Sequence, residues 1–360
     1  MKLSKSEISK RWRKYQQILV NKNIDGILLS SSQNIFYLTG YNFVREQDRE
    51  AFVLITPKDI VLLIHRMYAS QVKTLFPFLK LEIVNQSLFE TLANSYQGKK
   101  IGIEEINITV FEAQFLEKKQ IKLINISKDI ATLRAIKTTK EIKVIKEIEQ
   151  ITKKALEHTR QWISPGVTEK MVAEHLEKLM IEFGAFDSSF PTIVASGINS
   201  GIPHHMTSNR IIQENDIVMI DCGGKKDGYC GDLTRTYVLG KPSRIYNDVY
   251  KIVLQAQKTA LGQIKDGVKI ADIDLAVRKI FEEAGLIDHY WHTTGHGLGI
   301  GIHEYPSLHF SVQGLLQRGM VITVEPGLYF DWGGIRIEDV VVVTKTGFTT
   351  LSNLNHEEIN

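Results

Sequence analysis

The apolar positions of roughly the first 125 residues follow a helical spacing and then form short β-rich runs. The helical spacing extends from Ser4 to about Ile24, and further helical stretches fall between several of the β-rich runs. The expected strands are Gly26–Ser30, Ala51–Thr56, Ile60–His65, Leu81–Val84 and Ile101–Glu104. Alternating strands and helices predict a compact α/β domain. The segment contains no Gly-rich phosphate-binding motif, so nothing in it supports nucleotide binding.

The pattern changes near residue 127, where we expect a second domain to begin. Thr138 followed by Glu141 forms a capping-box signature, and isoleucines then recur at helical spacing as far as Ile151. We therefore predict an N-terminal domain of residues 1–126 and a C-terminal domain of residues 127–360. Each is long enough to bury a core of its own.

The second domain contains an internal repeat. A helical pattern preceded by Ile163-Ser-Pro-Gly returns 101 residues later, after Ile264-Lys-Asp-Gly. An apolar strand that ends in Asp221 is likewise followed, 104 residues on, by an apolar strand that ends in Glu325. The repeat favours an α+β domain made of two related halves that pack about a pseudo-twofold axis.

Four carboxylates occupy the strand ends of this repeat. Asp221 closes one strand, and Asp232 opens the next after a Gly-rich turn, so the two can lie opposite each other on a hairpin. In the second half Glu325 closes a strand and Glu338 opens the following one. All four converge if the halves pack about the pseudo-twofold axis.

Bare carboxylates held together repel one another, so a multivalent cation is their natural partner. The stretch His292–His303 can add an imidazole to the four carboxylates. That ligand set suits Mn, Co, Fe or Zn, whereas an all-oxygen set would suit Mg or Ca. The alternative is that these side chains are solvated turn residues, which a symmetric set beside a His/Gly cluster makes the weaker interpretation.

These residues resemble the metal-dependent pita-bread peptidases, which include methionine aminopeptidase, aminopeptidase P and prolidase. The strings that carry the resemblance are Asp221-Cys-Gly-Gly, Gly231-Asp232-Leu-Thr-Arg-Thr, Gly295-His296-Gly-Leu-Gly, Thr323-Val-Glu325-Pro-Gly and Arg336-Ile-Glu338-Asp. The resemblance covers about residues 127–360. The first domain, with Asn34-Ile-Phe-Tyr-Leu-Thr-Gly40, is similar to the N-terminal domain of the proline-directed branch and of creatinase. Methionine aminopeptidases generally lack this domain.

The resemblance implies a dinuclear metal site. Asp221 would be a bidentate ligand of one ion, and His296 and Glu325 would complete the other. Asp232 and Glu338 would bridge the two ions. We expect two divalent ions per chain, manganese first, with cobalt or zinc as alternatives because such ligands serve several metals.

Four further residues match family positions around the ligands. They are His204, His292, His303 and Arg336. Glu325 would also shuttle protons, while His204 and His303 would donate to the substrate carbonyl and the tetrahedral intermediate. Arg336 would support the bridging carboxylates. His205 lies next to His204 and is the alternative for the upstream role.

Composition and charge exclude several classes of protein. With 43% hydrophobic and 24% charged residues, the chain has an ordinary globular composition. Lys and Arg number 44 against 41 Asp and Glu, and a net charge of +3 is too small for a nucleic-acid or anionic-membrane binder. The sequence has no signal-peptide pattern and no apolar run that could span a membrane. Its two cysteines, Cys222 and Cys230, are expected to be reduced, and we expect a cytoplasmic protein.

The function predicted first is an Xaa-Pro dipeptidase, or prolidase, that acts on small peptides as a homodimer. Aminopeptidase P, which acts on longer Xaa-Pro peptides, is the nearest alternative. A creatinase-like amidinohydrolase shares the two-domain architecture but lacks the full ligand set that this sequence contains. A non-catalytic binding protein on the same scaffold would typically show broken ligand positions, and all five are intact here.

Overall fold

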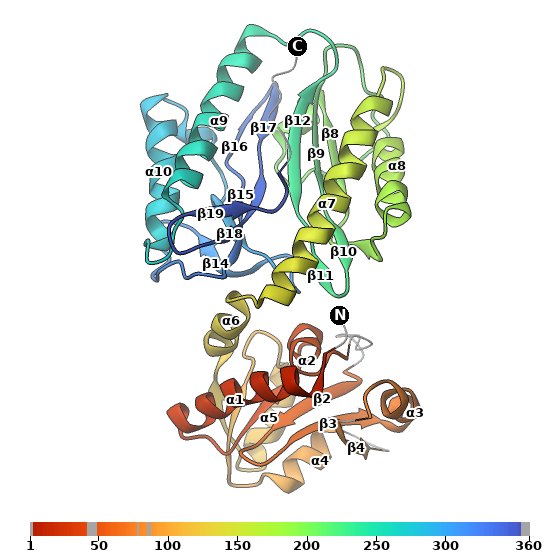
Figure 1. Cartoon of the computed structure of the whole chain (residues 1–360), viewed down its shortest axis with the longest axis vertical. Coiled ribbons are helices and arrows are strands. Elements are labelled where there is room, and N and C mark those ends of the chain that lie inside the picture. Colours follow the sequence, from red (N-terminus) through yellow and green to blue (C-terminus); the bar gives the residue numbers. More distant parts are fainter. Residues whose placement is uncertain (1–2, 42–48, 78, 85–87, 354–360) are drawn as a thin grey trace. The chain divides into compact units, whose positions relative to one another are not determined.

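The computed structural model describes residues 3–41, 49–77, 79–84 and 88–353 (Figure 1). It divides into two compact units, Met1–Leu133 and Arg134–Asn360. This division lies beyond the boundary expected after residue 126, because helix α6 (Ser127–Ala135) belongs mostly to the first unit. The hydroxyl of Tyr37 ties that helix to the unit by donating a hydrogen bond to the carbonyl of Leu133, 3.3 Å away.

A six-stranded mixed sheet forms the centre of the first unit, in the order β4-β3-β2-β1-β5-β6. Its strands are β1 Gly26–Leu29, β2 Ala51–Ile55, β3 Ile60–His65, β4 Lys80–Val84, β5 Lys100–Ile103 and β6 Lys122–Asn125. The five expected strands are all present with nearly the expected bounds, and β6 is an additional strand at one edge. The α/β class expected for this unit is therefore confirmed.

Helix α1 Lys5–Lys22 precedes the first strand. The helices between strands of the sheet are α2 Ser32–Thr39, α3 Arg66–Leu75, α4 Leu88–Ser95 and α5 Val110–Lys118. Helix α1 begins at a capping box, in which the backbone amide of Glu7 donates to the Ser4 hydroxyl and the Ser4 amide donates to the Glu7 carboxylate. It ends at Asn23, whose left-handed backbone (φ 51°) closes the last turn. The helix start expected from the sequence is thus correct.

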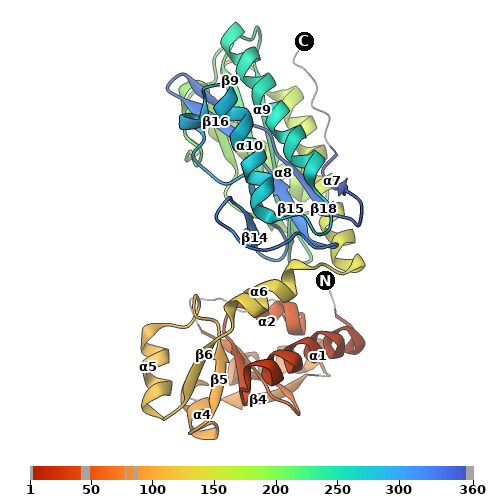
Figure 2. The same ribbon diagram turned by 90° about the vertical axis from the view of Figure 1, so that its left-hand side faces the viewer.

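The second unit consists of two halves with the same order of elements, a helix pair and then antiparallel strands (Figures 1 and 2). The first half contains α7 Thr139–Trp162, α8 Glu169–Glu182, β8 Ile193–Ser196, β9 Ile217–Cys222 and β12 Leu233–Val238. The second half contains α9 Arg244–Gln263, α10 Ile270–Glu283, β13 Gly295–Gly297, β14 Glu304–Leu308, β15 Val321–Val324, β18 Asp339–Val343 and β19 Phe348–Thr350. This arrangement matches the duplicated α+β class expected from the repeat.

Each half has its own apolar core beneath its helix pair. Ile148 of α7, Leu176 of α8 and Ile220 of β9 are fully buried in the first half. Val253 of α9 and Phe281 of α10 are fully buried in the second. Burying each such side chain stabilises the fold by roughly 1.5–3 kcal/mol. The two cores hold rigid the strands whose ends carry the carboxylates.

The hairpin of the first half differs from the expected simple turn. Strands β9 and β12 pair antiparallel with Asp221 opposite Thr234, so Asp232 is not directly opposite Asp221. Side chains two residues apart share one face of a strand, which leaves both carboxylates on the same face, offset along it. The residues between the strands form a second small hairpin of β10 (Gly224–Lys226) and β11 (Tyr229–Cys230).

The second half repeats this construction. Strand β15 pairs with β18, with Val324 opposite Asp339. The intervening residues again form a hairpin, of β16 (Gly327–Phe330) and β17 (Gly333–Arg336). Glu325 and Glu338 are the next positions beyond the Val324–Asp339 pair, so the second pair of carboxylates does lie at matched strand ends.

None of the described helices is both long enough and apolar enough to span a membrane.

Candidate metal centre

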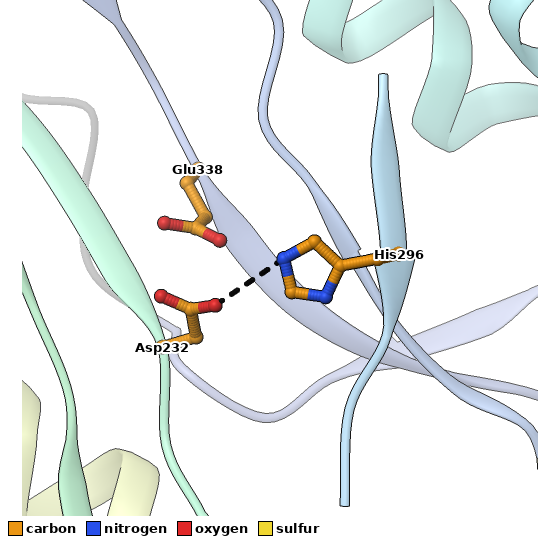
Figure 3. Close-up of side chains that lie close together, drawn as sticks. All are labelled: Asp232, His296 and Glu338. Atoms are coloured by element: carbon orange, nitrogen blue, oxygen red, sulfur yellow. Dashed lines mark ion pairs between the residues drawn. The ribbon is translucent and has the colours of Figure 1, made fainter. Parts of the chain in front are cut away.

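The five expected metal ligands lie at strand ends or in a short strand of the second unit. Asp232, His296 and Glu338 are buried and each offers one ligand atom, all three atoms lying within 4.8 Å of one another. Figure 3 shows these side chains pointing toward one another from separate segments of the chain. The structure thus gathers residues that are more than 100 positions apart in the sequence into one polar cluster.

The two remaining carboxylates are those of Glu325, which contacts His296, and of Asp221, which contacts Arg336. The Nε2 atom of His296 lies 3.1 Å from Oε1 of Glu325 and 3.5 Å from Oδ2 of Asp232. The hydroxyl of Thr323 also donates to Glu325, at 3.0 Å. Asp221 accepts a hydrogen bond from the guanidinium of Arg336, with Oδ2 and Nη2 2.6 Å apart.

Unsatisfied oxygens test whether a cation fits this site. Within the described part of the chain, Oδ1 of Asp221 and Oε1 of Glu338 are buried and have no hydrogen-bond partner. A buried carboxylate oxygen left without a partner is costly, and a cation would satisfy it. Several carboxylates with one imidazole are ligands that suit divalent ions such as Mn, Co or Zn. The donor set therefore fits a divalent metal ion.

The electrostatics of the site agree with this donor chemistry. Burial, and then the negative charges of neighbouring carboxylates, raise the pKa values of Asp232 and Glu338 well above their usual range. Burial also raises the pKa of Asp221, although the charge of Arg336 opposes it. Burial acts the same way on Glu325, but hydrogen bonding and charge from His296 outweigh it and lower that pKa to about 2. Excess negative charge of this kind favours a bound cation.

Arg336 connects the carboxylates to residues around them. Its Nη1 atom donates to the hydroxyl of Tyr329 at 2.8 Å and to the carbonyl of Pro203 at 3.1 Å. Its Nε atom donates to the hydroxyl of Thr234 at 3.1 Å, and that hydroxyl donates to Glu338 at 2.8 Å. The guanidinium therefore contacts both halves of the site and is 3% exposed.

Tyr329 is a site residue that the sequence did not indicate. It lies in the apolar strand β16 and is fully buried, and burial raises its pKa to about 12. Its hydroxyl accepts from Arg336 and lies 2.8 Å from Nε2 of His292. In the sequence a tyrosine between Leu328 and Phe330 reads as a core residue, so only the folded contacts identify it.

The predicted outer histidines all line the same pocket as the ligands. The ring of His303 packs almost perpendicular to that of His296, with centroids 4.5 Å apart. Burial, and then the charge of His296, lower the pKa of His303, so this ring favours its neutral form. Of the two adjacent histidines, His205 lies 2.9 Å from a fully buried carboxylate, that of Glu169, while His204 carries no such pairing among the described residues.

Two glycines beside the ligands allow close backbone approach. A Cβ atom on Gly223 would lie 1.9 Å from the carbonyl oxygen of Gly231, and one on Gly295 would lie 2.1 Å from that of Thr323. Both distances are well below any normal contact. The glycines of the strings around Asp221 and His296 are therefore required by packing of the strands that carry these ligands.

The pocket above the cluster has a volume of about 770 Å³, a size typical of small-ligand sites. Its polar lining includes Asp221, Asp232, His296 and Glu325, together with the outer histidines and Arg336. The rest of the wall includes apolar residues, namely Phe190, Pro191, Ile193, Pro203, Met206 and Ile302. Polar groups converging beside an apolar wall can both orient and bind a small, partly apolar substrate.

Comparisons with known proteins match both parts of the chain. Residues 143–345 match the model of metallopeptidase family M24, and residues 11–136 match the creatinase/prolidase N-terminal domain. The chain is 32% identical to an Xaa-Pro dipeptidase of Pyrococcus furiosus, over 97% of this chain and 99% of that one. It is 33% identical to an uncharacterized peptidase of Bacillus subtilis, over 96% and 98%.

Solved structures of Xaa-Pro dipeptidases also match nearly the whole chain. An Xaa-Pro dipeptidase from Bacillus anthracis superposes with a TM-score of 0.92 at 33% identity, covering 98% of this chain and 99% of that chain. A prolidase from Pyrococcus furiosus superposes with a TM-score of 0.89 at 31% identity, covering 95% and 100%. The fold, the carboxylate and histidine cluster and these matches lead to one conclusion: the chain belongs to metallopeptidase family M24 and is a metallopeptidase with a creatinase/prolidase N-terminal domain.

Proposed function

We propose that the protein is an Xaa-Pro dipeptidase, which hydrolyses the peptide bond before proline. The observation that carries this proposal is the buried cluster of Asp232, His296 and Glu338 at a pocket of about 770 Å³. Relatives named Xaa-Pro dipeptidase match nearly the whole chain, and they support the same substrate class here. The intact ligand set disfavours both a creatinase-like amidinohydrolase and a non-catalytic binding protein.

In this proposal five residues hold two divalent ions. Asp221 would be a ligand of one ion, His296 and Glu325 would be ligands of the other, and Asp232 and Glu338 would be shared by both. When bound, the ions would act as Lewis acids that lower the pKa of a water molecule and stabilise negative charge on oxygen. Manganese is the metal we propose first, with cobalt or zinc as alternatives.

Proton transfer is the task we assign to Glu325. Its carboxylate lies in the cluster with Oε1 3.1 Å from Nε2 of His296, so it can take a proton from water and pass it to the departing nitrogen. A proline nitrogen carries no amide hydrogen before cleavage, which makes its protonation an important step. The low pKa of Glu325 keeps the group ionised, which is the form that a metal ligand requires.

We assign His204 and His303 as hydrogen-bond donors to the substrate carbonyl and to the oxyanion that forms from it. Both line the pocket. The pairing of His205 with Glu169 supports the choice of His204, because it already uses one ring nitrogen of the neighbour. The neutral form favoured for the His303 ring still carries one N–H to donate.

Arg336, Tyr329 and His292 act in this proposal by orienting the residues that they contact. Arg336 fixes one oxygen of Asp221 and, through Thr234, one oxygen of Glu338. Tyr329 bonds both Arg336 and His292, so the three side chains form a continuous hydrogen-bonded support beneath the pocket. Outer partners of this kind usually change metal affinity or activity about 10–100-fold when they are replaced.

Dipeptide preference and dimerisation are the finer parts of the proposal. At equal concentration, manganese-loaded protein should release proline from Ala-Pro faster than it removes alanine from Ala-Pro-Ala, and it should leave Ala-Ala intact. The mass in solution should be that of a homodimer. Faster cleavage of the tripeptide would indicate an aminopeptidase P rather than a dipeptidase. No cleavage of either proline peptide would contradict the proposed function. The cytoplasmic location stays a prediction.

A further inference from the structure

A buried ion pair joins the two halves of the second unit directly behind the metal cluster. Nη2 of Arg235 lies 2.8 Å from Oδ1 of Asp339, and each side chain is only 3% exposed. Arg235 lies in β12, three residues after Asp232, and Asp339 opens β18, one residue after Glu338. The pair therefore links the strand of one bridging carboxylate to the strand of the other.

Backbone contacts of Arg235 strengthen this link. Its Nη1 atom donates to the carbonyl of Thr234 at 2.9 Å and also to the carbonyl of Glu338. The amide of Glu338 in turn donates to the carbonyl of Thr234 at 3.2 Å. One planar guanidinium thus bonds backbone atoms of both halves at the level of the ligands, a geometry that a lysine ammonium cannot reproduce.

Asp339 is held in place by residues from two other segments. Ser352 donates to its Oδ1 atom at 2.8 Å, and Gln257 of α9 donates to its Oδ2 atom at 2.9 Å. The carboxylate that anchors Arg235 therefore cannot turn away without breaking bonds to α9 and to the C-terminal segment.

The ion pair of Arg235 and Asp339 also opposes electrostatic repulsion between the proposed ligands. Asp232 and Glu338 bring two carboxyl groups into one cluster with His296, so the two groups repel each other when both are ionised and no cation lies between them. The attraction between Arg235 in β12 and Asp339 in β18 opposes separation of the two strands. A buried ion pair adds little to stability compared with apolar residues of similar size, so its value is better sought in the geometry it imposes.

We propose that Arg235 and Asp339 are positioning residues that set the spacing of Asp232 and Glu338, and through it the affinity for the second divalent ion. The inference rests on the proposed assignment of these two carboxylates as bridging ligands. Neither residue of the pair is among the residues that line the pocket, so we expect their effect on hydrolysis to come through metal binding.

The test measures metal binding to the whole protein rather than activity. Metal-free wild-type protein titrated with Mn²⁺ should bind two ions with the exchange-coupled electron paramagnetic resonance spectrum of a bridged pair. Arg235→Lys keeps the positive charge but loses the planar guanidinium that donates in several directions. This substitution should weaken binding of one ion about 10–100-fold and diminish the coupled spectrum. Arg210→Lys is the matched control. Arg210 forms an ion pair with Asp216, with Nη1 and Oδ2 2.6 Å apart, and neither residue belongs to the cluster. The Arg210→Lys protein should therefore bind two ions normally.

A second variant separates spacing from folding. Arg235→Met combined with Asp339→Leu replaces the pair with apolar side chains of similar size, which usually preserves the fold, as circular dichroism would verify. We expect this variant to be folded and still to bind the second ion weakly. Wild-type affinity and coupling in the folded double variant would overturn the positioning role. Failure of the wild-type protein itself to bind two ions would instead count against the proposed dinuclear function.

Discussion

Replacing Asp232 by asparagine should remove more than 99% of the hydrolytic activity and lower the metal content of the protein. Asp232 is 5% exposed and contributes one oxygen to the cluster with His296 and Glu338. As a proposed bridging ligand it matters to both ions, and its loss should exceed the roughly 100-fold effect that marks the upper range for outer partners. Metal analysis and kcat/KM for Ala-Pro would be measured together.

The matched control for this variant is Cys230→Ser, two residues away. Cys230 is also buried, but its thiol contacts the carbonyl of Ile300 at 3.4 Å and has no place in the cluster. We expect near-normal metal content and activity in this control. Similar, mild effects of both substitutions would show that Asp232 is not a bridging ligand.

Replacing His303 or His204 by alanine should lower kcat about 10²–10³-fold while the protein keeps its metal. Each is proposed to donate a hydrogen bond to the reacting carbonyl oxygen, and loss of one such donor typically costs about that much. Because neither is a proposed ligand, metal content should stay at the wild-type value. Steady-state kinetics and metal analysis on the same preparations would separate the two properties.

His205→Ala is the control for the choice between adjacent histidines. The bond of His205 to the buried carboxylate of Glu169 predicts a loss of stability larger than its loss of kcat. If His205→Ala lowers kcat strongly and His204→Ala does not, then the donor is the other neighbour.

Local patterns in the sequence were sufficient to predict most elements, and they singled out Asp232 and Glu338, which the structure brings close to His296. The capping box at Thr138 and Glu141 marks the start of α7, where the Glu141 amide donates to the Thr138 hydroxyl. The carboxylates were recognisable because they lie at the ends of apolar strands in both halves, closing one strand and opening the next. Such signals depend on residues close together in the chain, so they can be recognised without knowledge of the fold.

Features that depend on register or on distant contacts could not be predicted in this way. Strand β6 has no fully buried position, so its Lys-Leu-Ile-Asn sequence gives a weak pattern. The expected direct opposition of Asp221 and Asp232 was wrong, because the register of β9 and β12 places Asp221 opposite Thr234 instead. The Arg235–Asp339 pair joins residues 104 positions apart in the chain, and Tyr329 contacts His292 from 37 positions away, so the roles of these residues arise only in the folded chain.

The measurement that tests the central claim most directly is proline release from Ala-Pro during titration of metal-free protein with Mn²⁺. The proposed dinuclear site predicts no activity without metal, and activity that rises with added Mn²⁺ until two ions are bound per chain. Chelator should then abolish it again. Full activity in protein that contains no metal would contradict the account.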